Sequence, residues 1–199
     1  KGRQRQFHQV GVEAFGLEKP EADAEQILLL GRLWKSLGLK HITLELNSIG
    51  DPKDRIVYRE KLIAYFEANK EVLDDDALRR LYENPLRILD SKNKQMQSML
   101  NSAPKLIDYL SNDAKQHFED LCSILKEHNL EFKINTRLVR GLDYYNRTVF
   151  EWVSNDLGSQ GTIAGGGRYD YLVERIGGKP TSACGFAIGI ERIILLLED

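Results

Sequence analysis

The chain has 199 residues, and its 28 Lys and Arg nearly balance its 30 Asp and Glu, which gives a formal net charge of -2. Its 42% hydrophobic and 29% charged residues are typical of a globular protein and exclude a disordered tail, a collagen-like fibre and a disulfide scaffold. The length predicts one large domain, or one domain that carries an insertion. The near-neutral charge argues against a protein that binds nucleic acids nonspecifically through their phosphates.

Targeting and redox signals are few. No apolar run approaches the roughly 18 residues that a membrane span needs, and no segment resembles a signal peptide. Cys122 and Cys184 form no CxxC pair, so we expect two buried, reduced thiols and no zinc site. These features predict a cytoplasmic location and no membrane partner.

The first 50 residues predict a strand, a helix and a second strand. Residues 5–15 are poor in helix formers, and residues 41–49 alternate as a half-buried strand does. Between them, Pro20 is suited to open a helix and Gly38 to end it, and apolar residues recur at helical spacing along the stretch.

From residue 51 to about residue 130 the chain is rich in Lys, Glu and Asp and mostly helical in pattern. Asp51-Pro52 resembles an N-cap followed by proline at the first helical position. The acidic run 74–76 is interpreted as another helix start rather than a metal site. The predicted helices cover residues 52–69, 74–83, 92–101, 104–110 and 112–128.

Strand patterns return after Leu130. The predicted elements are strands at 132–136, 145–153, 159–168 and 184–188, with helices at 171–176 and 190–198. Strands on both sides of a helical stretch predict an α+β fold, with a mainly antiparallel sheet flanked by helices and a helical insertion. We expect a first core part at 1–50, the insertion at 51–130 and a second core part at 131–199. No P-loop and no Rossmann glycine pattern occur.

One face of the first predicted strand carries an unusual row of side chains, since alternate residues share a face. The row consists of Arg3, Arg5, Phe7, Gln9, Gly11, Glu13 and Phe15. A phosphate could bind at Arg3 and a flat base could stack on Phe7. Gln9 and Glu13 could fix a small polar ligand. The opposite face, which carries two valines, is the expected core face. A solvated sheet face is the alternative interpretation of the row.

Residues 140–148 form a second candidate site. A guanidinium held at Arg140, before the flexible Gly141, suits a phosphate or a carboxylate. Tyr144 and Tyr145 are adjacent, and adjacent residues on a strand point to opposite faces, so we expect at most one of them in a given pocket. The alternative is a surface ion pair at Arg140 with both tyrosines in the core.

Two glycine-bearing strands complete the candidates, at residues 164–170 and 185–192. Glycine within a strand marks the close approach of a ligand or another backbone, and a flexible turn is the alternative. Arg192 is expected in the first turn of the last helix, where a cation is unfavourable unless an anion binds there too. An ion pair with a neighbouring glutamate is the alternative. The four histidines lack ligand spacing, and no metal site is expected.

Taken together, these segments resemble the histidyl-tRNA synthetases, a family of class II aminoacyl-tRNA synthetases. RQFHQVGVEAFG (5–16) is similar to the second half of class II motif 2, and GFAIGIER (185–192) is similar to motif 3. LVRGLDYYNRTVFEW (138–152) and AGGGRYDYL (164–172) resemble the two histidine-specific motifs. The helical stretch falls where bacterial members carry an insertion domain.

The resemblance implies a pocket for L-histidine. Gln9 and Glu13 would hold its amino group and side chain, and Tyr144, Tyr145 and Tyr169 would complete the pocket. A buried carboxylate and tyrosine hydroxyls that pair with imidazole would be left unpaired by other amino acids, which would give specificity.

The resemblance also implies a site for ATP. Phe7 would stack on adenine, Arg3 and Arg192 would bind the phosphates, and Mg²⁺ would accompany the triphosphate. Arg140 would be the catalytic cation at the α-phosphate. Histidyl-adenylate would form first, and the histidyl group would then pass to tRNA(His).

Several family features are absent from these 199 residues: motif 1, the first strand of motif 2 and the anticodon-binding domain. We therefore expect an internal catalytic fragment with an open sheet edge and with weak or no adenylation, cut from a full-length homodimer. The alternative function is that of the non-catalytic, histidine-sensing regulatory subunit of ATP phosphoribosyltransferase. A sensor has no need for the adenylation residues Phe7, Arg140 and Arg192, so their presence favours the synthetase.

Overall fold

A computed structural model describes residues 5–158 and 161–198. Its described part contains a six-stranded sheet with the spatial order β1-β6-β5-β4-β2-β3, in which only the β2–β3 pair is parallel. The fold is therefore α+β with a mostly antiparallel sheet, as the sequence predicts. The strands are β1 (Gln9–Phe15), β2 (Ile42–Ser48), β3 (Lys133–Ile134), β4 (Asn146–Ser154), β5 (Thr162–Arg168) and β6 (Ala183–Gly189).

Helices α1 (Pro20–Ser36) and α5 (Asn112–Glu127) cover one face of this sheet. Apolar residues recur at every third or fourth position of both helices and so lie on one face of each helix. These faces pack with the strands into one buried cluster. Members from the helices and strands include Ile27, Leu30, Leu121, Leu125, Leu46, Phe150 and Phe186. The short helix α6 (Leu172–Arg175) and the last helix α7 (Ile190–Glu198) follow β5 and β6.

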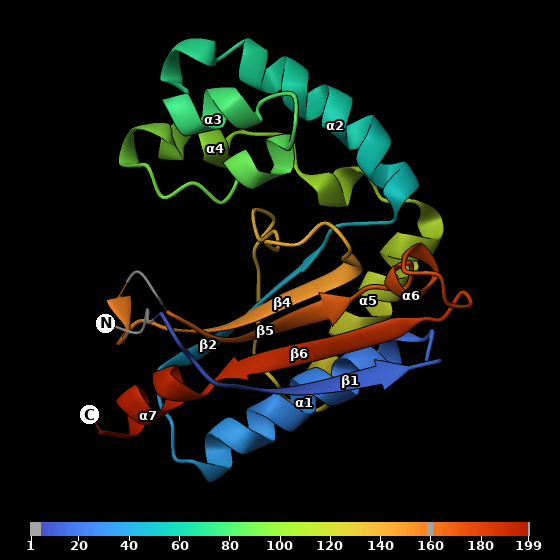
Figure 1. The fold of residues 1–199 in the computed structure, drawn as a ribbon, viewed down its shortest axis with the longest axis vertical. Helices are drawn as coiled ribbons and strands as arrows, with labels where there is room; N and C mark the ends of the chain where they lie inside the picture. The colour runs from blue at the N-terminus through green and yellow to red at the C-terminus, as the bar shows by residue number, and fades with distance from the viewer. Residues whose placement is uncertain (1–4, 159–160, 199) are drawn as a thin grey trace.

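Residues 52–109 lie beyond the other face of the sheet, and we call them the helical block (Figure 1). The block has its own buried cluster, which continues onto Leu138, Val139 and Tyr145 beside the sheet. Its start is capped as expected, because the amide of Asp51 donates to Asp54 at 3.0 Å. Its helices are α2 (Pro52–Glu67), α3 (Asp75–Arg80) and α4 (Gln97–Asn101), with 3-10 turns η1 (Lys70–Val72), η2 (Pro85–Ile88), η3 (Lys94–Met96) and η4 (Leu106–Tyr109).

The acidic run starts a helix, as predicted, since Asp74 accepts a hydrogen bond from the amide of Ala77 at 2.9 Å. Helix α5 ends the helical stretch of the sequence but packs against α1 rather than against the helical block. The expected helix at 104–110 is only the 3-10 turn η4, because Pro104 and the short length leave a single turn.

The edge strand β1 differs from its prediction in two ways. It begins at Gln9 rather than at residue 5. Val10 and Val12 lie opposite Ile188 and Phe186 on the face of α1, but they are 52% and 40% exposed. The expectation of a buried valine face is therefore wrong, because β1 pairs on one side only and lies beyond the shared cluster of the helices.

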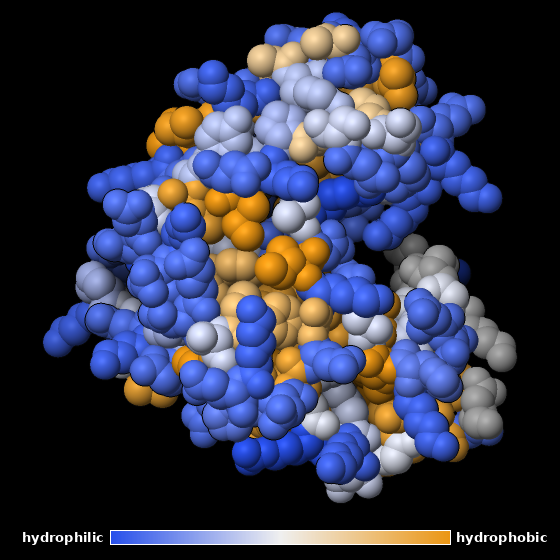
Figure 2. All heavy atoms as spheres, turned by 180° about the vertical axis from the view of Figure 1, so that it is seen from behind, coloured by the Kyte–Doolittle hydropathy of each residue, from blue (hydrophilic) through white to orange (hydrophobic). Residues whose placement is uncertain are grey.

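The surface carries apolar residues at several places. Figure 2 shows them gathered across the middle of the face opposite to that of Figure 1, surrounded by hydrophilic residues. Across residues 5–158 and 161–198, no helix is long and apolar enough to span a membrane. Cys122 and Cys184 are free and buried, as predicted.

Candidate active site

Three glycines leave the sheet bare on the face that points away from α1. Gly165 and Gly167 of β5 and Gly185 of β6 share this face, because Gly167 lies opposite Gly185 and Gly165 lies opposite Ala187. A methyl group at Gly185 would overlap the Glu13 carboxylate, and one at Gly165 would approach Arg140 Nη1 to 2.6 Å. The glycines therefore allow Glu13 and Arg140 to lie close to the sheet. The glycine pattern in the sequence predicts a close contact but does not say which side chains make it.

Tyrosine rings cluster at one end of this glycine floor. The ring centroids of Tyr144 and Tyr145 are 4.6 Å apart, and those of Tyr144 and Tyr169 are 5.6 Å apart. The rings of Phe15 and Tyr169 form an edge-to-face pair with centroids 6.5 Å apart. Tyr145 is buried in the cluster of the helical block and Tyr144 is partly buried against it, so the expectation that at most one of them lines a given pocket stays a prediction. Strand alternation is not its basis, because both residues precede β4.

Glu13 joins this cluster from the edge strand. The Tyr169 hydroxyl donates a hydrogen bond to Glu13 Oε2. Burial, together with this bond and the charge of Glu13, raises the pKa of Tyr169, and burial raises the pKa of Tyr144 to about 12. Both phenols are therefore neutral hydrogen-bonding groups at physiological pH. The Glu13 side chain itself is exposed rather than buried, since β1 is the sheet edge.

Arg140 lies across the middle of the floor. Its Nη1 pairs with Glu151 Oε1 of β4, and its guanidinium carbon is 5.7 Å from the ring centroid of Tyr145. The Nε atom is buried and has no hydrogen-bond partner within the described residues. The alternative of an ion pair at Arg140 with both tyrosines in the core is met in part. Arg140 does pair with Glu151 and Tyr145 is buried, but the ion pair is only about one-fifth exposed. A planar guanidinium in this position can receive a phosphate or a carboxylate.

Arg192 lies at the other end of β5, in the first turn of α7. Its Nη1 donates to the carbonyl of Thr162, and the Thr162 hydroxyl donates to Glu151 Oε2 at 2.8 Å. Arg140 and Arg192 are thereby both connected to Glu151 and Thr162. From Thr162 to Tyr169 the chain advances seven residues, or about 23 Å as a strand. Arg192 thus lies toward one end of β5 and Tyr169 at the other, with Arg140 between them against Gly165.

The remaining predicted residues lie near the start of β1. Gln9 is exposed and opposite Gly189 in register. Phe7 lies in the irregular segment before β1 and is 60% exposed, so strand alternation does not reach it. Arg3 lies outside the described residues. The start of β1 is tied to α7, because the amide of His8 donates to Glu191 at 2.9 Å.

A buried charge network lies directly behind the tyrosines, and the sequence interpretation missed it. Arg168 is fully buried and pairs with Asp23 of α1 and with Asp170, the latter at 3.0 Å. Asn146 donates to Asp170 at 2.9 Å and also accepts from the amide of Asp170. One sequence feature could have revealed the network: Arg168 lies in a strand that is expected to be buried, directly after three glycines. A buried arginine requires a paired carboxylate, so an acidic partner could have been predicted.

Comparison with known proteins decides the family. A family model described as histidyl-tRNA synthetase matches residues 1–193. The chain belongs to the histidyl-tRNA synthetase family. It is 60% identical to the histidine–tRNA ligase of Methylobacillus flagellatus, in a match that covers 100% of this chain and 48% of that relative. The crystal structure of apo histidyl-tRNA synthetase from S. aureus shares 37% identity and a TM-score of 0.76, and the match covers 98% of this chain and 47% of that chain.

A third synthetase-like match bears on the alternative function. The structure of an ATP phosphoribosyltransferase regulatory subunit/histidyl-tRNA synthetase from Bacillus halodurans has a TM-score of 0.59 at 25% identity, over 96% of this chain and 53% of that chain. The chain thus spans about half the length of the histidyl-tRNA synthetase relatives that it matches.

Proposed function

We propose that this chain is the part of a histidine–tRNA ligase that binds L-histidine and ATP and forms histidyl-adenylate. The observation that carries the proposal is the Glu13–Tyr169 pair beside Tyr144, held over a bare Gly185. A carboxylate and neutral hydroxyls offer an acceptor and donors to the two imidazole nitrogens. An amino acid without such nitrogens would not use these hydrogen-bonding groups, which would favour histidine.

In the first step, a carboxylate oxygen of histidine attacks the α-phosphorus of ATP, the bond to the β-phosphate oxygen breaks, and pyrophosphate leaves. Arg140 would stabilise the negative charge that develops on the phosphoryl oxygens. Its buried Nε and its limited exposure favour this role, because charge interactions are stronger where water is excluded. Arg192 and Arg3 would hold the outer phosphates, and Phe7 would stack on adenine. Mg²⁺ would arrive with the triphosphate.

In the second step, a ribose hydroxyl at the 3′ end of tRNA(His) attacks the carbonyl carbon of the adenylate, and AMP leaves. No covalent enzyme intermediate is needed, so positioning and charge stabilisation would supply the rate. We further propose that the whole protein works as a homodimer and that the chain is divided at residues 50 and 130 into core, insertion and core.

The alternative is a histidine-sensing regulatory subunit of ATP phosphoribosyltransferase, a name that one of the structural relatives carries in part. Such a sensor would use the tyrosine end of the site alone. The placement of Arg140 over Gly165 and of Arg192 beside Thr162 supports the ligase, because histidine binding by itself requires neither cation.

The test is histidine-dependent exchange of pyrophosphate into ATP, with other amino acids as controls. The 199-residue chain should exchange weakly or not at all. A chimera in which this chain replaces the matching segment of the Methylobacillus flagellatus relative should exchange with histidine only, and Arg140→Met should abolish the exchange. The proposal fails if the chimera folds, binds histidine and does not exchange, and activation of a phosphoribosyltransferase by that chimera would establish the alternative.

A further inference from the structure

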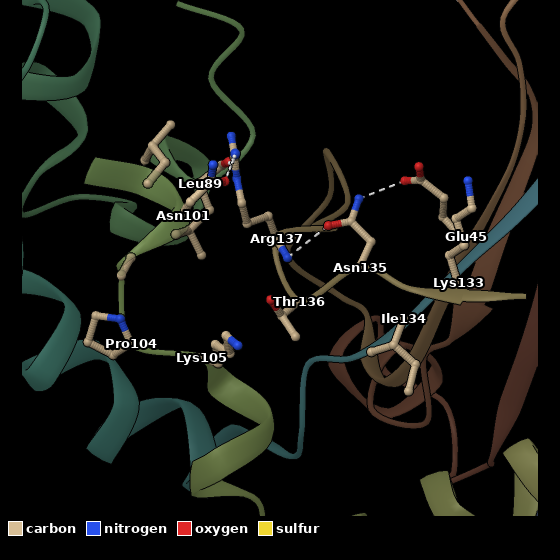
Figure 3. A pocket seen from close by; sticks show the side chains of 12 residues that line it. Glu45, Leu89, Asn101, Pro104, Lys105, Lys133, Ile134, Asn135, Thr136 and Arg137 are labelled. Carbon is tan, nitrogen blue, oxygen red and sulfur yellow. Dashed lines mark hydrogen bonds between the residues drawn. The ribbon is translucent and has the colours of Figure 1, made fainter. Parts of the chain in front are cut away.

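Arg137 connects the helical block to the chain segment that leads to Arg140 (Figure 3). Its Nε donates to the carbonyl of Leu89 at 3.0 Å, and its Nη1 donates to the side chains of Gln97 and Asn101 at 3.0 and 2.8 Å. Its Nη2 donates to the carbonyl of Ser91 at 3.3 Å. One side chain therefore holds the turn after η2 and the helix α4 together.

The same segment is fixed to the sheet from its other side. Asn135 donates to Glu45 of β2 at 2.6 Å, and the amide of Asn135 donates to the carbonyl of Leu46. Asn47 donates to the carbonyl of Leu138 at 3.0 Å. Residues 135–138 are thus hydrogen-bonded to β2. On the side of the helical block, Leu138 packs in the apolar cluster and Arg137 makes the hydrogen bonds described above.

The acceptors around Arg137 are all uncharged: two main-chain carbonyls and two amide oxygens. This set selects for geometry rather than for charge, because a planar guanidinium has five donors in a rigid fork, whereas lysine has three donors on one atom. Leu138 and Val139 follow and are buried in the cluster of the helical block. Arg140 comes next, so the distance along the chain from the clamp to the proposed catalytic cation is three residues.

We propose that Arg137 is a positioning residue that fixes the segment carrying Arg140 against the helical block and thereby sets the rate of adenylate formation. The proposal rests on the role proposed for Arg140. Misplacement of a reacting group by about 1 Å can lower a rate by about 10²-fold. A loss of positioning acts on the transition state, so kcat should fall while KM for histidine and ATP stays nearly constant.

The test uses the chimera described above and measures histidine-dependent exchange of pyrophosphate. Arg137→Met should lower kcat about 10- to 100-fold, and Arg137→Lys should lower it nearly as much because lysine keeps the charge but not the fork. The matched control is Arg79→Met, which removes an exposed arginine of the helical block from its ion pair with Asp76. If Arg137→Lys restores full activity, the geometric role is wrong.

A double-mutant cycle separates positioning from a general loss of folded protein. In an Arg140→Lys background, Arg137→Met should lower kcat by less than about threefold, because the residue through which it acts is already impaired. An equal factor in both backgrounds would overturn the proposal.

Hydrogen exchange provides a readout that does not depend on activity. Amides of residues 138–143 should exchange faster in Arg137→Met than in Arg79→Met, and unchanged exchange would overturn the clamp itself. If the unmodified chimera forms no adenylate, the proposed function fails and the catalytic part of this inference fails with it. The hydrogen exchange would still decide whether Arg137 holds the segment.

Discussion

Arg168 offers a direct test of the buried charge network behind the candidate site. The guanidinium is fully buried, with Nε 3.1 Å from Asp23, Nη1 3.0 Å from Asp170 and further bonds to the carbonyls of Leu17 and Lys19. Arg168→Met would leave two carboxylates in a buried site without their counter-charge. Breaking a buried pair in this way costs about 3–5 kcal/mol. At about 2–4 °C per kcal/mol for a chain of this size, we expect Tm to fall by about 6–20 °C.

Thermal and urea unfolding of the 199-residue chain would measure the effect, with Arg79→Met as the control. The control removes an exposed arginine, so its Tm should stay close to that of the parent chain. Because the loss comes from an uncompensated charge, the double variant Arg168→Met, Asp23→Leu should be more stable than Arg168→Met alone. A fall in Tm within about 3 °C of the control would refute the reasoning.

The pH dependence of the same variant tests the electrostatic cause. Burial acts to raise the pKa of Asp23, but hydrogen bonds and charges of His117 and Arg168 outweigh it and hold the pKa below its ordinary value. A carboxyl with a lowered pKa contributes stability above its unfolded pKa of about 3.9 and loses it as the pH falls through the folded value. The Tm difference between the parent chain and Arg168→Met should therefore shrink below about pH 4. A difference that is independent of pH would contradict this.

Three further predictions concern the site and the thiols. Tyr169→Phe removes the hydroxyl that orients Glu13 and that is proposed to bond the imidazole. Because a polar partner left unpaired costs about 1–3 kcal/mol, KM for histidine in the chimera should rise about 5- to 150-fold while KM for ATP is unchanged. Because the pKa of Tyr144 is raised to about 12, the tyrosinate absorbance that Tyr144→Phe removes should appear only above about pH 11. Burial raises the pKa of Cys122 to about 11 and of Cys184 to about 12, so a thiol reagent at pH 8 should modify both in urea and neither in the folded chain.

Much of the fold follows from local sequence signals. The proline at position 20 and the glycine at position 38 bound α1 within two residues, and Asp51 begins α2 as expected. Strands β4, β5 and β6 lie close to their predicted ranges. These elements are marked by caps, turns and period-2 alternation, which act within a few residues.

The contacts that assemble the site are less accessible from sequence. The sequence pattern predicts Tyr144 and Tyr145 on a strand, whereas both precede β4 and their rings contact Tyr169. The pairing of Arg168 with Asp23 joins residues 145 positions apart, and no local pattern encodes it. Arg137 likewise has its partners in the helical block, at sequence separations of 36–48 residues. Such contacts depend on how the elements pack, and periodicity reports only which face an element buries.

The glycine-rich strand β5 also explains why the charge network lies where it does. Glycine within a strand is unfavourable by about 0.5–1 kcal/mol relative to alanine, so Gly165, Gly166 and Gly167 together weaken β5 by about 1.5–3 kcal/mol. Arg140 and Tyr145 lie against two of the three glycines, so a larger side chain there would displace them. Arg168 directly follows them and pairs with the buried Asp23 of α1 and with Asp170, which binds the strand end to α1. Arg168 pairs with Asp23 on the face of α1, so it holds the end of β5 beside Tyr169 from the face opposite to the candidate site. The strand that forms the floor of the candidate site is therefore held from behind, at the residue next to Tyr169.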